Sequence, residues 1–144
     1  MANPDHILFL VSRLQERAYR YLSRELEQRG IEGIEPSHGA ILRQLSTHGS
    51  LSMSRLAELI GRTKPTVTVL VRKLVKHGYV ECMKDPTDSR VTQVHLTEKA
   101  NVLADDFQEV SRLMRRRIYR GFAKRDRQEL VERLEKAIQN FGGG

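Results

Sequence analysis

Asp88 and Arg90 stand two positions apart in DPTDSR, a polar segment between two stretches that alternate apolar and polar residues. The alternation predicts a β-hairpin, and Asp85-Pro86 are residue types that start a turn. At the tip of a hairpin, the Asp88 carboxylate can hold the planar guanidinium of Arg90 through two hydrogen bonds. An arginine presented in this way suits the negative potential of a narrow DNA minor groove. The alternative is an ordinary surface salt bridge.

The segment from Thr63 to His77 has an apolar stripe on one side and basic and hydroxyl side chains on the other. Thr63 fits a helix N-cap and Pro65 is tolerated in the first turn. The stripe predicted to be buried consists of Val67, Leu70, Val71, Leu74 and Val75. A helix of this kind fits the major groove of B-DNA, whereas a solvated cationic face is the alternative. The candidate DNA-binding residues are Arg62, Thr63, Lys64, Thr66, Thr68, Arg72, Lys73, Asp88 and Arg90.

Apolar periodicity predicts a mainly helical scaffold around these residues. Helices are expected over about 5–29, from Pro36 to just before Gly49, from the Ser52 cap until Gly61 breaks the helix, and over 63–77. The short GRT linker between the last two predicts a helix-turn-helix. Two hairpin strands should follow, with Val80, Met83, Val94 and Leu96 toward the helices. A helix from Thr97 to about Ala123 and a last helix from about Arg125, with Phe141 on its apolar side, complete the chain.

The stretch from LSMSRLAELIG to VHLTEKA resembles the winged helix-turn-helix core of the MarR-type regulators (multiple-antibiotic-resistance regulators). The matching motifs are LAELIG, PTVT, LVRKLVKHGYV, DPTDSR and LTEKA. The resemblance implies a mainly α fold with a small β-hairpin wing, in one domain over 1–144. The winged core would cover about 36–96, and dimerisation helices about 5–29 and 97–141. Val69 and Cys82 depart from the family pattern, which often has charged residues there.

The resemblance also implies a function. It implies a homodimeric transcriptional regulator on a pseudo-palindromic operator, with the recognition helices in successive major grooves and the Asp88/Arg90 wing at the minor groove. Repression relieved by a small aromatic or anionic ligand is part of this expectation. Tyr19, Ser37 and His38 are candidates for lining the ligand site, although Tyr19 also fits a core position and His38 a helix surface. The residues expected at the dimer interface, or else in a monomer core, are Ile7, Leu10, Leu14, Leu130, Leu134, Ile138 and Phe141.

The composition limits the classes of partner that we expect. The 144 residues include 25 Lys or Arg against 18 Asp or Glu, a formal charge of +7, which favours a polyanionic partner. Double-stranded DNA is the first expectation, and an acidic protein bound by a winged-helix interaction module is the alternative. The sequence has no P-loop, GxGxxG, GxSxG or metal-ligand spacing, so we expect no enzyme activity, metal or cofactor. It has no membrane-spanning run or signal peptide, so we expect a cytoplasmic protein.

Two features are less directly tied to DNA. Cys82 is the only cysteine, so it cannot form an internal disulfide, and we expect a buried small hydrophobe rather than a redox sensor. The arginine-rich stretch over 112–127 is either a solvated face or a flank that contacts distal phosphates.

Overall fold

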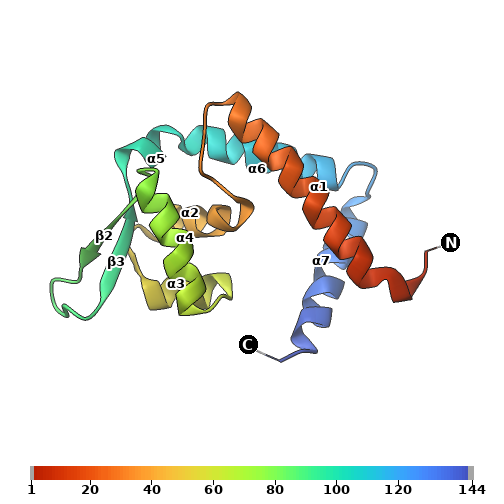
Figure 1. Ribbon diagram of the computed structural model, residues 1–144. Helices are drawn as coiled ribbons and strands as arrows, with labels where there is room; N and C mark the ends of the chain where they lie inside the picture. Colours follow the sequence, from red (N-terminus) through yellow and green to blue (C-terminus); the bar gives the residue numbers. More distant parts are fainter. Residues whose placement is uncertain (1, 143–144) are drawn as a thin grey trace.

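The computed structural model describes residues 2–142, so the ends of the domain predicted over 1–144 (residues 1, 143 and 144) lie outside the described residues. Helices dominate, and a small sheet lies at one end of the molecule (Figure 1). The elements in chain order are η1 (Pro4–His6), α1 (Ile7–Gln28), α2 (Pro36–His48), β1 (Leu51–Ser52), α3 (Met53–Ile60), α4 (Lys64–Lys76), β2 (Val80–Lys84), β3 (Thr92–Leu96), α5 (Glu98–Val102), α6 (Ala104–Ile118) and α7 (Lys124–Gln139).

Hydroxyl side chains cap the starts of the helices where the sequence predicts them. The Ser52 hydroxyl accepts from the Arg55 backbone N–H at 3.1 Å, and the Thr97 hydroxyl accepts from the Ala100 N–H at 3.4 Å. Each bond satisfies one of the N–H groups that have no partner in the first turn of a helix. Gly61 ends α3 with a φ of 66°, a left-handed conformation that glycine adopts without strain.

The sheet has three antiparallel strands in the order β1-β3-β2, where the sequence predicted two. Val80 pairs with Leu96 and Cys82 with Val94 in the hairpin. β1 pairs with β3 through Leu51 opposite Val94. A two-residue strand is too short to show alternation, which explains why β1 was not predicted. β1 connects the start of α3 to the β2–β3 hairpin through its pairing with β3.

One hydrophobic core joins α2, α3 and α4 to the sheet and to the C-terminal half of α1. The buried residues include Leu26, Ile41, Leu56, Leu74 and Val94, each at most 3% exposed. Leu103, Phe107 and Met114 pack against this core from the chain that follows the hairpin. The core therefore holds α4 firmly from one side and leaves its other side outward.

Two predictions for the first hairpin strand were wrong. Met83, expected to face the helices, is 55% exposed. Val80 is buried, and side chains alternate between the two faces of a strand, so Met83 lies on the opposite face from Val80. Cys82 is exposed rather than buried, although it pairs with the buried Val94, and it lies on β2, an edge strand of the sheet. Partial desolvation raises the pKa of its thiol, which disfavours the reactive thiolate.

The helix predicted from Thr97 to about Ala123 is two helices. Leu103, with φ −90° and ψ 1°, separates α5 from α6, although its N–H still bonds the Lys99 carbonyl. α6 ends at Ile118, before Gly121, whose φ of 82° turns the chain into α7. The region predicted as dimerisation helices over 97–141 thus contains three helices, and Phe141 lies beyond the end of α7, 92% exposed.

α1 packs against α6, and together they lead away from the winged end of the molecule (Figure 1). Only Leu22 and Leu26 of α1 are buried, so its first half contributes nothing to the core. Ile7, Leu10 and Leu14 are 46–51% exposed and Ile138 is 69% exposed, whereas Leu130 and Leu134 are half-buried. The alternative that these residues close a monomer core is therefore wrong for the exposed ones.

Candidate nucleic-acid interface

α4 has one face in the core and one in solvent. Thr63 caps its start, accepting from the Thr66 N–H at 3.4 Å, with Pro65 in the first turn. Val67, Val71 and Leu74 are buried and Leu70 is half-buried, as predicted. Val75 was predicted in the same stripe but is 43% exposed. It lies at the edge of the stripe, about 80° around the helix from Val67.

The outward face of α4 carries most of the predicted DNA-binding residues. Arg62, Thr63, Lys64, Thr66 and Arg72 are exposed. The Thr63 hydroxyl donates to the Thr66 hydroxyl oxygen at 2.9 Å, which leaves the proton of Thr66 available to an outside acceptor. Because the N-terminus of a helix attracts anions, Thr66 and the free backbone N–H groups beside it suit a phosphate oxygen.

Two of the predicted DNA-binding residues are engaged within the protein. The half-buried Thr68 donates its hydroxyl proton to the Lys64 carbonyl at 2.9 Å. Lys73 Nζ lies 2.5 Å from Oε1 of Glu35, the residue just before α2. This hydrogen bond is the largest cause that lowers the Glu35 pKa. Lys73 thus links α4 to α2, a partnership that no spacing in the sequence indicates.

The wing presents Arg90 on a braced tip. Arg90 donates to both carboxylate oxygens of Asp88, from Nε at 3.1 Å and from Nη2 at 3.2 Å, which is the bidentate pair expected from the sequence. The Arg90 side chain is nevertheless 88% exposed. The Asp88 pKa is lowered, first by its hydrogen bonds from the Arg90 side chain and backbone. Asp88 therefore fixes the orientation of the guanidinium, which remains accessible to a ligand.

Asp85 stiffens the base of the same turn. Its carboxylate accepts from the hydroxyl and N–H of Thr87 at 2.6 and 2.8 Å, and from the Gln93 amide at 2.9 Å across the hairpin. These bonds lower the pKa of Asp85 to about 2. The sequence indicated that Asp85 would bond the backbone ahead of it, but the bond to Gln93 depends on the strand register.

The loop between α1 and α2 clasps the C-terminal end of α4. The Tyr79 hydroxyl donates to the Glu32 carbonyl at 2.9 Å, and Gly33 lies directly against the His77 ring. His38, predicted on a helix surface, is fully buried, and its Nδ1 accepts from the Glu35 N–H at 2.8 Å. Among the described residues, His38 Nε2 is the buried side-chain polar atom without a hydrogen-bond partner.

A cleft of about 590 Å³ lies between α1, α2 and α6. Apolar side chains such as Leu22, Leu42 and Phe107 line it together with Arg43 and Arg112. The predicted candidates Tyr19, Ser37 and His38 do not line this cleft. Tyr19 is not a core residue either, because it is 37% exposed and its hydroxyl accepts from Gln15 Nε2.

The comparisons with known proteins agree with this arrangement. Residues 34–92, which span α2 to the start of β3, match the MarR family. The uncharacterized HTH-type transcriptional regulator YkoM of Bacillus subtilis (strain 168) is 27% identical over 126 residues, 87% of this chain and 82% of YkoM. A MarR transcriptional regulator from Methanosarcina mazei Go1 superposes with a TM-score of 0.75 at 26% identity, covering 94% of this chain and 96% of that one.

The segment over residues 34–92 belongs to the MarR family. The HTH-type transcriptional repressor IacR of Pseudomonas putida is 30% identical over 101 residues, 70% of this chain and 60% of IacR. In this fold, α3 and α4 form the helix-turn-helix, and the hairpin of β2 and β3 forms the wing. The protein is thus a transcriptional regulator of a DNA-binding family, and its relatives are regulators rather than enzymes.

Two kinds of site were sought in the part of the chain that the structure describes: a metal site and a membrane span. In residues 2–142, no group of three or more His, Cys, Asp or Glu side chains could hold a metal ion. Within the same residues, no helix has both the length and the apolar character needed to cross a membrane.

Proposed function

We propose that the protein binds a pseudo-palindromic site in double-stranded DNA as a homodimer. The α4 helix of each protomer would enter one of two successive major grooves, and Arg90 would reach into the adjoining minor groove. The observation that carries the proposal is the arrangement of α4. Its core face is fixed by Val67, Val71 and Leu74, while a basic and hydroxyl face points outward beside a wing with an exposed, braced arginine.

The proposed DNA-binding residues fall into two groups. Arg62, Lys64, Thr66 and Arg72 are exposed on or beside α4 and can reach phosphates or base edges directly. Thr68 and Lys73 are engaged within the protein and the exposed Thr63 caps α4, so we propose that these three residues position α4. Asp88 would position Arg90 in the same way.

We further propose that the protein is a repressor released by a small aromatic or anionic ligand. The cleft between α1, α2 and α6 supports this role, because its apolar lining suits a ring and its arginines suit a carboxylate. Arg112 is paired with Glu109 at 2.7 and 2.9 Å, so an anion there would compete with Glu109 for the guanidinium. The cleft borders both α1, proposed for dimerisation, and α2, which supports α4.

Selection of bound fragments from genomic DNA, followed by gel shifts, tests the proposal. We expect sequence-dependent binding whose log affinity falls with log salt by about 0.9 per phosphate neutralised. Adding phenolic acids should reduce the fraction of DNA that is shifted. Equal affinity for all duplex sequences would contradict the proposal and favour a module that binds an acidic protein.

Arg90→Ala tests the wing. We expect the operator affinity to fall about five-fold or more, because a cation is lost from the minor groove. Arg125→Ala is the matched control: the Arg125 side chain is also 88% exposed and also pairs with an acid, Glu129, but it lies in α7. If both variants bind as tightly as the parent protein, the wing has no part in DNA binding. If both weaken equally, the effect reflects net charge rather than the wing.

A further inference from the structure

Val69 is an apolar side chain in the middle of the outward face of α4. It is 65% exposed, whereas Val67 and Val71, two positions away on either side, are at most 1% exposed. Two positions correspond to about 200° around a helix, so Val69 points away from the core. The Val69 side chain therefore contributes little to packing within the chain.

The neighbours of Val69 are the polar residues assigned to DNA in the proposed function. Thr66 precedes it by three positions and Arg72 follows it by three, so the three side chains form one row along the helix. All three are exposed. If Thr66 meets a phosphate at the start of α4 and Arg72 reaches the DNA one turn further on, Val69 lies between them against the base edges.

A valine side chain has neither a hydrogen-bond donor nor an acceptor, so it cannot recognise the polar atoms of a base edge. Placed against the amino group of cytosine or the O6 of guanine, it would remove water from a polar atom without replacing the hydrogen bond. The apolar group in the major groove is the C5-methyl of thymine, and it is the partner that a valine suits. We propose that Val69 contacts a thymine methyl and selects a T·A pair in each half-site.

This inference rests on the proposed function, and replacing thymine by deoxyuridine tests it separately. Deoxyuridine keeps the base pairing and removes only the C5-methyl. In the selected operator, each thymine is replaced in turn, and the affinity is measured by fluorescence anisotropy. We expect one position in each half-site at which the replacement weakens binding about four-fold, the effect of removing one buried methyl group from the contact.

Val69→Ala identifies the side chain responsible. At the sensitive position, this variant should bind the thymine and deoxyuridine operators equally. Val75→Ala is the matched control, because Val75 is also an exposed valine of α4 but lies about 120° around the helix from Val69 and about 9 Å nearer the C-terminal end. The control should keep the full methyl dependence.

The outcomes distinguish the inference from the function beneath it. If no duplex is bound in a sequence-dependent manner, the proposed function fails and the inference fails with it. If the operator is bound but no deoxyuridine replacement matters, only the inference is overturned. It is also overturned if Val69→Ala retains the methyl dependence of the parent protein.

Discussion

His38 is an ionisable residue in a place where a charge is costly. It is fully buried beneath α4, and its Nδ1 accepts from the Glu35 N–H, so the neutral ring must carry its proton on Nε2. Burial is the largest cause that lowers its pKa. Glu35 and the Leu70 carbonyl oppose this shift, whereas Lys73 and His77 add to it. A second proton would have to replace the bond to Glu35, so the folded protein keeps His38 neutral.

Acid should therefore destabilise the protein through His38. Above about pH 7 the ring is neutral in both the folded and the unfolded chain. As pH falls below 6.5, the unfolded chain binds a proton that the folded chain does not, so stability is lost at up to about 1.4 kcal/mol per pH unit. Urea unfolding between pH 7.5 and 5.5 should show this loss, and His38→Gln should reduce it.

His48→Gln is the control, because His48 is in the same helix but exposed. It should leave the pH dependence unchanged. In the parent protein, the NMR signals of the His38 ring should not titrate near pH 6.5. A midpoint at that value would show that burial does not control this residue, whether or not His38→Gln folds.

The α1–α2 loop is the element that joins the outer helix α1 to the C-terminal end of α4, the helix proposed to bind DNA. Three contacts hold the loop in place: Tyr79 bonds the Glu32 carbonyl, Lys73 pairs with Glu35, and Gly33 lies against His77. Gly33 has a φ of 77°, and a Cβ added there would lie 2.2 Å from the His77 ring. The close contact fixes the loop against the end of α4. Position 33 requires glycine both for its positive φ and for the lack of space for a Cβ.

Gly33→Ala should be strongly destabilising. Gly30→Ala is a matched control, because Gly30 has a similar φ of 69° but nothing within 4 Å of an added Cβ. Both variants bear the backbone strain, about 1 kcal/mol, and Gly33→Ala adds overpacking of about 1–3 kcal/mol. Equal losses of stability for the two variants in urea unfolding would mean that the contact with His77 does not matter. Adding His77→Ala to Gly33→Ala should restore part of the loss.

The helices and strands were largely predictable from the sequence, whereas the burial of individual side chains was less predictable. Helical spacing and the capping residues Ser52, Thr63 and Thr97 placed the helix starts, because both signals are local. The burial of His38 and the exposure of Met83 depend on which neighbouring element covers each position. Local patterns do not contain that information, and one residue of misjudged register moves a strand side chain to the other face.

The candidate DNA-binding residues show the same division. Charge and residue type identified the exposed Arg90 and Arg72, but Lys73 has the same charge and is paired with Glu35, 38 residues away in sequence. The sequence singled out Val69 only as a departure from the family pattern, which often has a charged residue there. Its exposure, which supports a contact with a base, required the packing of α4 on the core.

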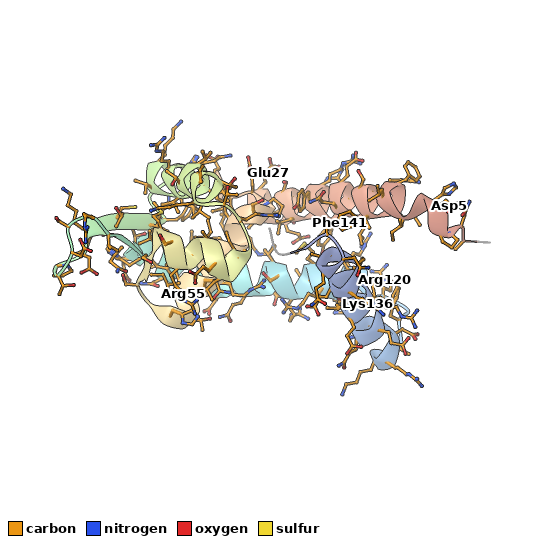
Figure 2. All side chains as sticks on the ribbon, turned by 90° about the horizontal axis from the view of Figure 1, so that it is seen from below. Asp5, Glu27, Arg55, Arg120, Lys136 and Phe141 are labelled. Carbon is orange, nitrogen blue, oxygen red and sulfur yellow. The ribbon has the colours of Figure 1, made fainter. Side chains whose placement is uncertain are left out.

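At the scale of the whole molecule, positive charge is spread rather than confined to the winged end. Arg55 lies on α3, whereas Arg120 and Lys136 lie at the opposite end (Figure 2). Within the stretch over 112–127, Arg112 and Arg125 pair with glutamates of their own helices. These pairs neutralise part of the charge of this stretch, as Asp88 does for Arg90, and a solvated face and a phosphate contact stay the two predictions for it.

The exposed apolar side chains, in contrast, gather in the terminal helices. Ile7, Leu8, Phe9 and Leu10 are 50–80% exposed at the start of α1, and Ile138 and Phe141 are 69% and 92% exposed near the C-terminal end. Water-exposed apolar surface of this extent is typical of a protein interface. A second copy of the chain covers such a surface in the proposed dimer and also brings a second α4 to the DNA.

Leu10→Asp should therefore convert the dimer to a monomer without unfolding it, because Leu10 is 50% exposed and lies outside the core. A charge buried in the dimer interface is costly, whereas in the monomer it is solvated. Light scattering after gel filtration should give twice the 16.6 kDa chain mass for the parent protein and the single mass for the variant. Operator affinity should fall at least 100-fold, roughly the loss of one of two linked contacts. Met83→Asp is the control for the mass, since Met83 is 55% exposed on β2, outside both regions predicted for dimerisation, and its replacement should leave the dimer intact. A monomeric parent protein, or a Leu10→Asp variant that stays dimeric with full affinity, would place the dimer interface elsewhere or remove it.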